Sequence, residues 1–236
     1  MSKKIKVNYF FRNSRDGFAQ STQLLGLEPI PFIKYFSTKR ESSAYLKCPA
    51  FLEYFKNTFV IFSPYTLDIN IDRTRPWCSI NSIPQDVFNE FVEFRTHQFG
   101  INDPVILTLP PKIVFYSNEE VTIESIPLFL DRSEYGKNLR VIPGSFRIDK
   151  WVRPVDFTCE ILDDRKNILI KRDDPIFCVR FSNPDNLDIN LERVLPTKDL
   201  EKLSHECVSL KFYMKNLGLK QLYKLSENYL KLLGKK

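Results

Sequence analysis

The two histidines are the residues that could most directly bind a metal. A non-haem iron centre takes two His and one carboxylate, and the chain has only His97 and His205. Gln98 and Phe99 follow His97, so the His-x-Asp pair is absent, and His205-Glu206 lacks the second His of a zinc-protease helix. We therefore predict no metal ligand and no cofactor. A cupin-like metal-dependent oxygenase or carbohydrate-modifying enzyme, in which the fold brings both His to one carboxylate, stays as an alternative.

The sequence contains no familiar motif for nucleophilic or nucleotide chemistry. GxSxG, Walker and GxGxxG patterns are absent. Asp68, Asn70 and Asp72 resemble the start of a calcium loop, but Arg73 and Ser79 stand where that loop needs Gly and Glu. The alternation of apolar and polar residues over 67–72 instead indicates a β-strand with one wet face. We assign no catalytic residue.

Trp151 and Arg153 are of the types that anchor binding interfaces. They lie in the stretch PGSFRIDKWVRP at 143–154, and Trp and Arg are frequent interface anchors. We predict a binding wall on the rim of a β domain, made of these two residues with His97 and Arg180. The alternative is structural, because a Trp before a strand can plug one end of a β-sandwich while an Arg covers it.

The last 40 residues carry most of the net charge. The chain has a formal charge of +6, and residues 197–236 hold nine Lys against four acidic residues, which leaves +1 for the rest. On a helix, Lys220, Lys224, Lys231 and Lys235 fall within roughly 60° of one another. This stripe suits a nucleic acid, an anionic membrane surface or an acidic protein. A solvated face whose Lys stems cover Leu and Tyr is the interpretation we favour.

Most of the chain reads as short strands separated by turn residues. Pro, Asn, Asp and Gly punctuate apolar or alternating segments, which is typical of an antiparallel sheet. The predicted strands are 4–11, 58–62, 67–72, 105–109, 112–116, 121–125, 139–142, 153–162, 167–171 and 175–181. Short helices are predicted near 43–56 and 84–94. The predicted fold is mainly β, an antiparallel β-sandwich over residues 1–196, followed by a Lys-rich helical appendage at 197–236.

The C-terminal segment has the period of an amphipathic helix. Thr197 can cap a helix whose first turn holds Asp199 and Glu201. The spacing of Leu200, Leu203, Cys207, Leu210, Met214 and Leu217 is helical, and the same spacing resumes after Gly218 with a shift of one residue. Two amphipathic helices, or one kinked helix, account for the shift. They pack on the β domain or mediate a dimer.

Two segments of the chain resemble each other. Residues 60–76 and 179–196 are identical at ten aligned positions when Asn183 is treated as an insertion. An ancient duplication of a strand–turn–strand unit would explain the identities, so the sandwich is predicted to be pseudo-duplicated. Coincidence within the common pattern of strands and turns is the alternative.

Five short stretches carry a resemblance to a known family. They are CP at 48–49, KNTFVI at 56–61, HQFG at 97–100, the segment from Pro143 to Thr158, and KRDDPIF at 171–177. Together they resemble uncharacterised proteins of marine T4-like phages and some bacteria, over roughly residues 40–181. Family members usually carry Gly where Asp173 stands, so that turn is expected to differ. The resemblance implies a phage or phage-related genome, and it brings no activity and no catalytic residue.

The composition bounds the compartment and the function class. Five Cys, an odd number with no CxxC pair, indicate buried reduced thiols, and no signal peptide or membrane span is visible. We predict the cytoplasm of a bacterial or phage-infected cell. The favoured function is a non-enzymatic binding or assembly protein that contacts a protein partner or forms a homo-oligomer through the β rim and the C-terminal helices. A nucleic-acid-associated protein is a second alternative to the enzyme, although nucleic acid is not the favoured partner.

Overall fold

The protein is mainly β, as predicted, in a computed structural model that describes residues 3–12, 28–39, 42–64, 66–72, 77–80, 93–94, 104–109, 112–129, 131–214 and 216–232. Its strands are β1 (Lys4–Phe11), β2 (Ile30–Pro31), β3 (Thr58–Phe62), β4 (Leu67–Asp72), β5 (Trp77–Ile80), β6 (Glu93–Phe94), β7 (Val105–Leu109), β8 (Ile113–Tyr116), β9 (Thr122–Ile126), β10 (Leu139–Val141), β11 (Gly144–Arg147), β12 (Phe157–Ile161), β13 (Ile168–Ile170), β14 (Pro175–Ser182) and β15 (Asp188–Arg193). Its helices are α2 (Phe32–Ser37), α3 (Ser42–Tyr45), α4 (Pro49–Tyr54), α6 (Glu134–Asn138), α7 (Lys198–Tyr213) and α8 (Leu219–Leu232).

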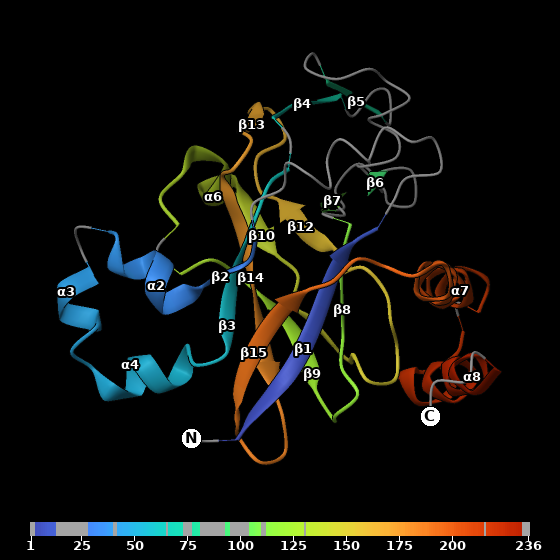
Figure 1. Ribbon diagram of the computed structural model, residues 1–236. Helices are drawn as coiled ribbons and strands as arrows, with labels where there is room; N and C mark the ends of the chain where they lie inside the picture. Colours follow the sequence, from blue (N-terminus) through green and yellow to red (C-terminus); the bar gives the residue numbers. More distant parts are fainter. Residues whose placement is uncertain are drawn as a thin grey trace.

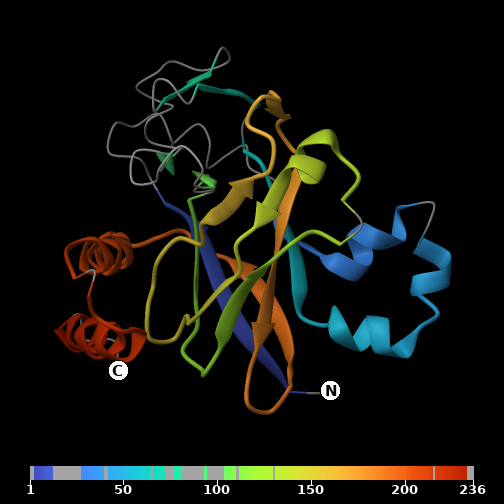
Figure 2. The ribbon, with the colours of Figure 1, turned by 180° about the vertical axis from the view of Figure 1, so that it is seen from behind.

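The described strands form four sheets around a central apolar core, and two further apolar clusters lie beneath the helices. Their orders are β11-β9-β14-β3-β2, β15-β1-β8, β10-β12-β7-β6 and β13-β4-β5. Among the described pairings only β1 with β15 is parallel. Side chains from all four sheets meet in the central core, including Val7, Phe59, Ile69, Leu107 and Phe177. Figure 1 shows β1 and β15 side by side across the body, with α2–α4 on one side and α7 and α8 on the other, and Figure 2 shows the same arrangement from behind.

Strands β3 and β14 are apolar on both faces. Phe59 and Ile61 of β3 point into the central core, while Val60 and Phe62 point to the opposite face. On that outer face they meet Phe32, Phe36 and Phe55 of the α2–α4 segment, where the rings of Phe32 and Phe55 stack at 4.0 Å. The helices therefore cover a sheet face that would otherwise expose large apolar side chains.

Several predicted elements need correction. The helix predicted near 43–56 is two short helices, α3 and α4, because Pro49 starts α4 after the extended Cys48. Of the helix predicted at 84–94, Glu93 and Phe94 form strand β6, and the rest lies outside the described residues. Helix α2 was not predicted from the sequence.

The similar segments at 60–76 and 179–196 do not pack equivalently. Val60 and Phe62 face the helices, whereas the aligned Val179 and Phe181 face the central core. Strand β4 pairs with β13 and β5, whereas β15 pairs with β1. The repeated residues therefore have different neighbours, and the geometry does not support a pseudo-duplicated unit.

Asp173, in the turn between β13 and β14, has a positive φ. Its φ is 67°, a left-handed conformation that favours glycine and that Asp tolerates better than most residues. The Asp173 amide donates to the Ser63 carbonyl at 2.8 Å, and the turn joins β13 to β14. An Asp thus occupies a backbone position suited to Gly.

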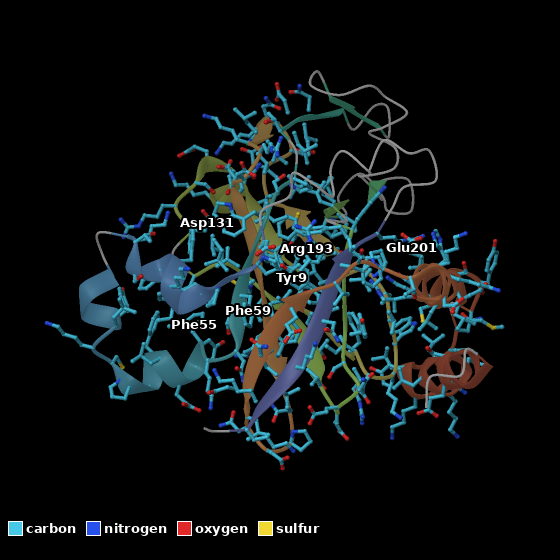
Figure 3. All side chains as sticks on the ribbon, in the orientation of Figure 1. Tyr9, Phe55, Phe59, Asp131, Arg193 and Glu201 are labelled. Carbon is cyan, nitrogen blue, oxygen red and sulfur yellow. The ribbon has the colours of Figure 1, made fainter. Side chains whose placement is uncertain are left out.

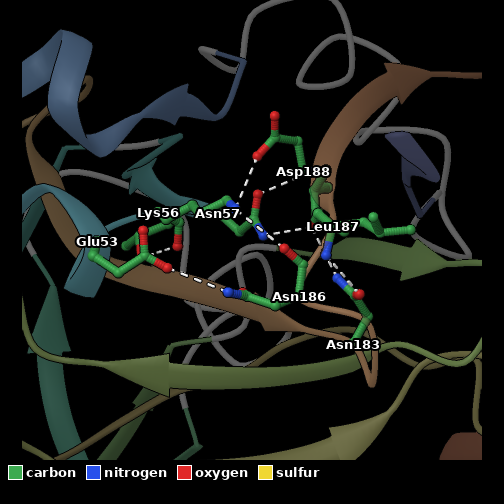
Figure 4. A network of polar contacts seen from close by, with 9 residues as sticks. Glu53, Lys56, Asn57, Asn183, Asn186, Leu187 and Asp188 are labelled. Carbon is green, nitrogen blue, oxygen red and sulfur yellow. Dashed lines mark hydrogen bonds and ion pairs between the residues drawn. The ribbon is translucent and has the colours of Figure 1, made fainter. Parts of the chain in front are cut away.

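Asn57 ties the β14–β15 turn to the end of the α2–α4 segment. Figure 4 shows the network around its side chain. The Asn57 amide nitrogen donates to the Leu187 carbonyl at 2.9 Å, and its oxygen accepts the Ile189 amide at 2.8 Å. The Phe181 amide donates to the Asn57 carbonyl at 3.0 Å. The side chain therefore satisfies two backbone groups at the start of β15.

Replacing Asn57 tests this arrangement. Asn57 has φ 56°, so Asn57→Ala loses two hydrogen bonds and also strains the backbone. We expect the free energy of unfolding to fall by about 3–4 kcal/mol, from about 1 kcal/mol for each of the two bonds and a further 1–2 for the left-handed backbone. Asn57→Gly removes the bonds without the strain, so its loss should be smaller. Urea midpoints of both variants measure this, and equal midpoints for Ala and wild type would contradict it.

Candidate binding surface on the C-terminal hairpin

Trp151 and Arg153 lie beneath the C-terminal helices. Trp151 is 3% exposed, and its indole nitrogen donates to the Cys207 carbonyl of α7 at 3.2 Å. Arg153 is 9% exposed, and its guanidinium binds the Asp156 carboxylate at 2.5 Å. The predicted binding wall is therefore covered, because these side chains make contacts within the chain.

An aromatic cluster joins the body to α8. The Trp151 ring lies edge-on to Phe146, with centroids 5.8 Å apart, and to Tyr223 of α8, at 6.2 Å. The Arg153 guanidinium lies 5.3 Å from the Phe146 ring and 5.2 Å from the Trp151 ring, which adds a cation–π contribution. The Tyr223 hydroxyl accepts the Arg147 amide at 2.9 Å.

Apolar packing and an ion pair fix the inner side of the hairpin formed by α7 and α8. Leu203 and Cys207 of α7 and Leu222 of α8 share a buried cluster with Phe10 and Val114 of the body. Lys150 of the body and Glu227 of α8 also form an ion pair, with Nζ and Oε1 2.5 Å apart. Thr197 caps α7 by accepting the Leu200 amide at 3.2 Å, as its sequence position predicts. The hairpin is thus held in one orientation.

The remaining predicted binding residues do not join Trp151. The Arg180 guanidinium binds Glu124 of β9 and lies 4.9 Å from the Tyr54 ring, on the side of the body covered by α4. His97 lies outside the described residues. Arg180 and Trp151 therefore sit beneath different helical layers, and the structure does not assemble them into one site.

His205 contacts a cation. The Arg12 guanidinium lies within hydrogen-bonding distance of the His205 ring, at 3.3 Å from Nε2 and closer to Nδ1. Within the described ranges no group of three His, Cys, Asp or Glu is placed to hold a metal ion. His205 therefore links α7 to the chain just after β1.

A polar junction between β1 and β15 was not predicted from the sequence. Tyr9 and Arg193 are register partners, and Figure 3 shows them close together in the body. Burial and the neighbouring Glu28 carboxylate raise the pKa of Tyr9 to about 12, while Arg193 opposes them. Tyr9 therefore keeps its proton at neutral pH, and its hydroxyl donates to the Glu28 carboxylate.

The outer side of the hairpin is basic and locally apolar. Lys220 and Lys224 of α8 are exposed, while Leu222 and Ser226 on the opposite side are buried. Lys231 lies within α8, but its side chain and all of Lys235 fall outside the described set. Tyr213 is 79% exposed, and Met214 and Leu219 are 44% exposed, around the link between the helices. We call Tyr213, Met214 and Leu219 the apolar edge.

The sequence pattern missed the apolar edge. Met214 continues the helical spacing from Leu200, which predicted a buried position. The structure ends α7 at Tyr213, and Met214 is its C-cap, with φ −108° and ψ 49°. Since the backbone leaves the helix there, the side chain no longer lies on the buried face.

Comparison with family models, curated proteins and solved structures finds no match for the chain. The resemblance to proteins of marine T4-like phages thus stays a prediction. Within the described ranges, none of the helices combines the length and the apolar character needed to cross a membrane.

The Trp151 anchor can be tested by substitution. Trp151→Ala removes the ring contacts and the bond to Cys207, so we expect a loss of about 3–5 kcal/mol. Hydrogen exchange of the α7 and α8 amides should accelerate more than that of β3 and β14, because the hairpin loses its anchor. Trp151→Phe keeps a ring and should lose less. Unchanged exchange in both helices of Trp151→Ala would contradict the anchoring role.

The burial of the thiols has a chemical consequence. Cys48 is exposed, which corrects the expectation for that residue, whereas Cys159, Cys178 and Cys207 are buried. Burial raises the pKa of Cys159 to about 12 and also raises the pKa of Cys178 and Cys207. Cys78 has no described side chain.

Thiol labelling measures this burial. In a Cys48→Ser/Cys78→Ser variant, disulfide-reagent labelling at about pH 8 should be at least ~100-fold slower in the native state than in urea, because thiolate is scarce and shielded. The unfolded variant serves as the reference. Equal native and unfolded rates would show that the three thiols are accessible.

Proposed function

We propose that the protein is a non-enzymatic assembly protein in which two copies associate through the apolar edge of the C-terminal hairpin. The β-rich body, which we interpret as a β-sandwich, serves as the support that holds the hairpin. The prediction that the protein is phage-encoded fits an assembly role, and this part of the proposal rests on the sequence resemblance.

The exposure of Tyr213 is the observation that carries the proposal. Met214 and Leu219 lie beside it in the chain, so three large apolar side chains gather within seven positions of the sequence. Isolated surface apolar residues are ordinary, but clustered ones are typical of interaction sites. Tyr and Met are also enriched at interface cores.

The inner side of the hairpin favours this edge over a coiled coil between copies. Leu203, Cys207 and Leu222 are already buried against the body, so the amphipathic faces are occupied. The sequence also predicted partner contacts at Trp151 and Arg153, but those residues are buried between the body and the hairpin. Because the helices are held in place, little ordering entropy opposes association.

Sedimentation equilibrium tests the proposal. We expect the full chain to populate a dimer between about 1 and 100 µM. Tyr213→Glu/Met214→Glu should raise the dissociation constant at least about tenfold, because two charges enter the contact.

Leu162→Glu/Leu169→Glu provides a matched control. These leucines are 49% and 46% exposed, close to the 44% of Met214. The variant adds the same charge away from the hairpin. A wild-type chain that stays monomeric over this range, or equal weakening by both variants, would refute association through the apolar edge.

A further inference from the structure

Lysine positions lie in a row along one side of α8. Lys220 and Lys224 are exposed one turn apart, and the position of Lys231 lies on the same side of the helix two turns further. With about 1.5 Å of rise per residue, Lys220 and Lys231 lie about 16 Å apart along the helix axis. We call these three positions the Lys face. Its length suits an extended polyanion better than one phosphate.

The surroundings leave the Lys face positive. Glu227, the single acidic residue in the sequence of α8, falls on the same side of the helix between Lys224 and Lys231, and its charge is paired with Lys150 of the body at 2.5 Å. The segment 197–236 has a formal charge of +5, from nine Lys and four acidic residues, against +1 for the rest of the chain. The positive charge is therefore concentrated in the C-terminal segment of the sequence.

The composition of the Lys face selects among anionic partners. Among the described side chains from Lys220 to Glu227 no large apolar residue is exposed, and Leu222 is buried against the body, so this stretch of α8 offers no apolar wedge for insertion into a lipid surface. A nucleic acid needs none, because cations that neutralise phosphates supply most of the non-specific affinity. Lysine is a point charge without the planar fork of Arg, so it reads phosphate and carries little base information.

We infer that the Lys face of α8 binds the phosphate backbone of a nucleic acid without base specificity. At 3.4 Å per nucleotide along one strand, the row spans about five steps. Three Lys contacts predict a slope of log affinity against log salt of about −2.7 for a duplex. This binding uses residues different from those of the apolar edge and stands whether or not the chain dimerises.

Fluorescence anisotropy with a labelled duplex of about 20 base pairs tests the inference at several salt concentrations. The full-length chain should bind tightly at low salt and lose affinity with the stated slope. Lys220→Gln/Lys224→Gln should reduce the magnitude of the slope by about 1.8 and weaken binding at about 50 mM salt by roughly 10- to 100-fold.

Lys34→Gln/Lys47→Gln is the matched control. Both Lys are exposed, the loss of charge is identical, and they lie in α2 and between α3 and α4, on the opposite side of the body in Figure 1. The control should bind like wild type, which would show that place, and not net charge alone, decides affinity. Circular dichroism of each variant checks that the fold is kept.

Three outcomes would overturn the inference. One is duplex affinity that does not change in Lys220→Gln/Lys224→Gln. Another is equal weakening by the control variant. The third is the absence of duplex binding while vesicles containing phosphatidylserine bind the chain and release the Lys220→Gln/Lys224→Gln variant, which would assign the Lys face to a membrane surface.

Discussion

The need to cover both faces of the central strands dominates this structure. All five side chains of β3 are buried, and Phe59 and Val60 show the two directions in which they point. A sheet that is apolar on both faces needs a layer on each, because each exposed Phe or Ile would forgo about 1.5–3 kcal/mol of transfer free energy. The aromatic helices α2–α4 supply one outer layer. On the other side, Phe10 and Val114 require a cover, and α7 and α8 provide it.

This constraint also fixes what the hairpin can present. Leu203, Cys207 and Leu222 face the body, and Trp151 and Tyr223 hold α8 in place. The outward side is then determined by the helical period, which turns Lys220 and Lys224 to solvent. Trp151 and Arg153 illustrate that the properties of an interface anchor are also those of an internal one. Large area and a cation–π contact stabilise packing within a chain as they do between chains.

Much of the fold was predictable because alternation is a local property. The strands predicted at 4–11, 58–62, 67–72 and 105–109 coincide with β1, β3, β4 and β7. The parallel pairing of β1 with β15 was not predictable, because it joins segments more than 180 positions apart and follows from the packing of the whole body. Likewise, β3 and β14 are apolar on both faces, so their sequence does not say which side meets the core. For this reason the similarity of 60–76 to 179–196 does not translate into equivalent packing.

In the candidate site, too, local spacing predicted some features, whereas others depended on tertiary packing. Helical spacing predicted that Lys220 and Lys224 share a face, and the exposed side of α8 follows from that spacing. The burial of Trp151 depended on which residues α7 and α8 bring to it. The exposure of Met214 depended on where α7 ends, and the apolar period did not reveal that point.

The two surfaces of the hairpin have a joint consequence. The apolar edge lies at the link between the helices, and the Lys face runs along α8 away from that link. Two copies joined at their apolar edges would carry two Lys faces in one particle. The second face would then meet the same nucleic acid as an intramolecular partner, with an effective concentration set by the dimer geometry. Weak lysine contacts, which give little affinity one at a time, would in this way combine into stable binding that still ignores sequence.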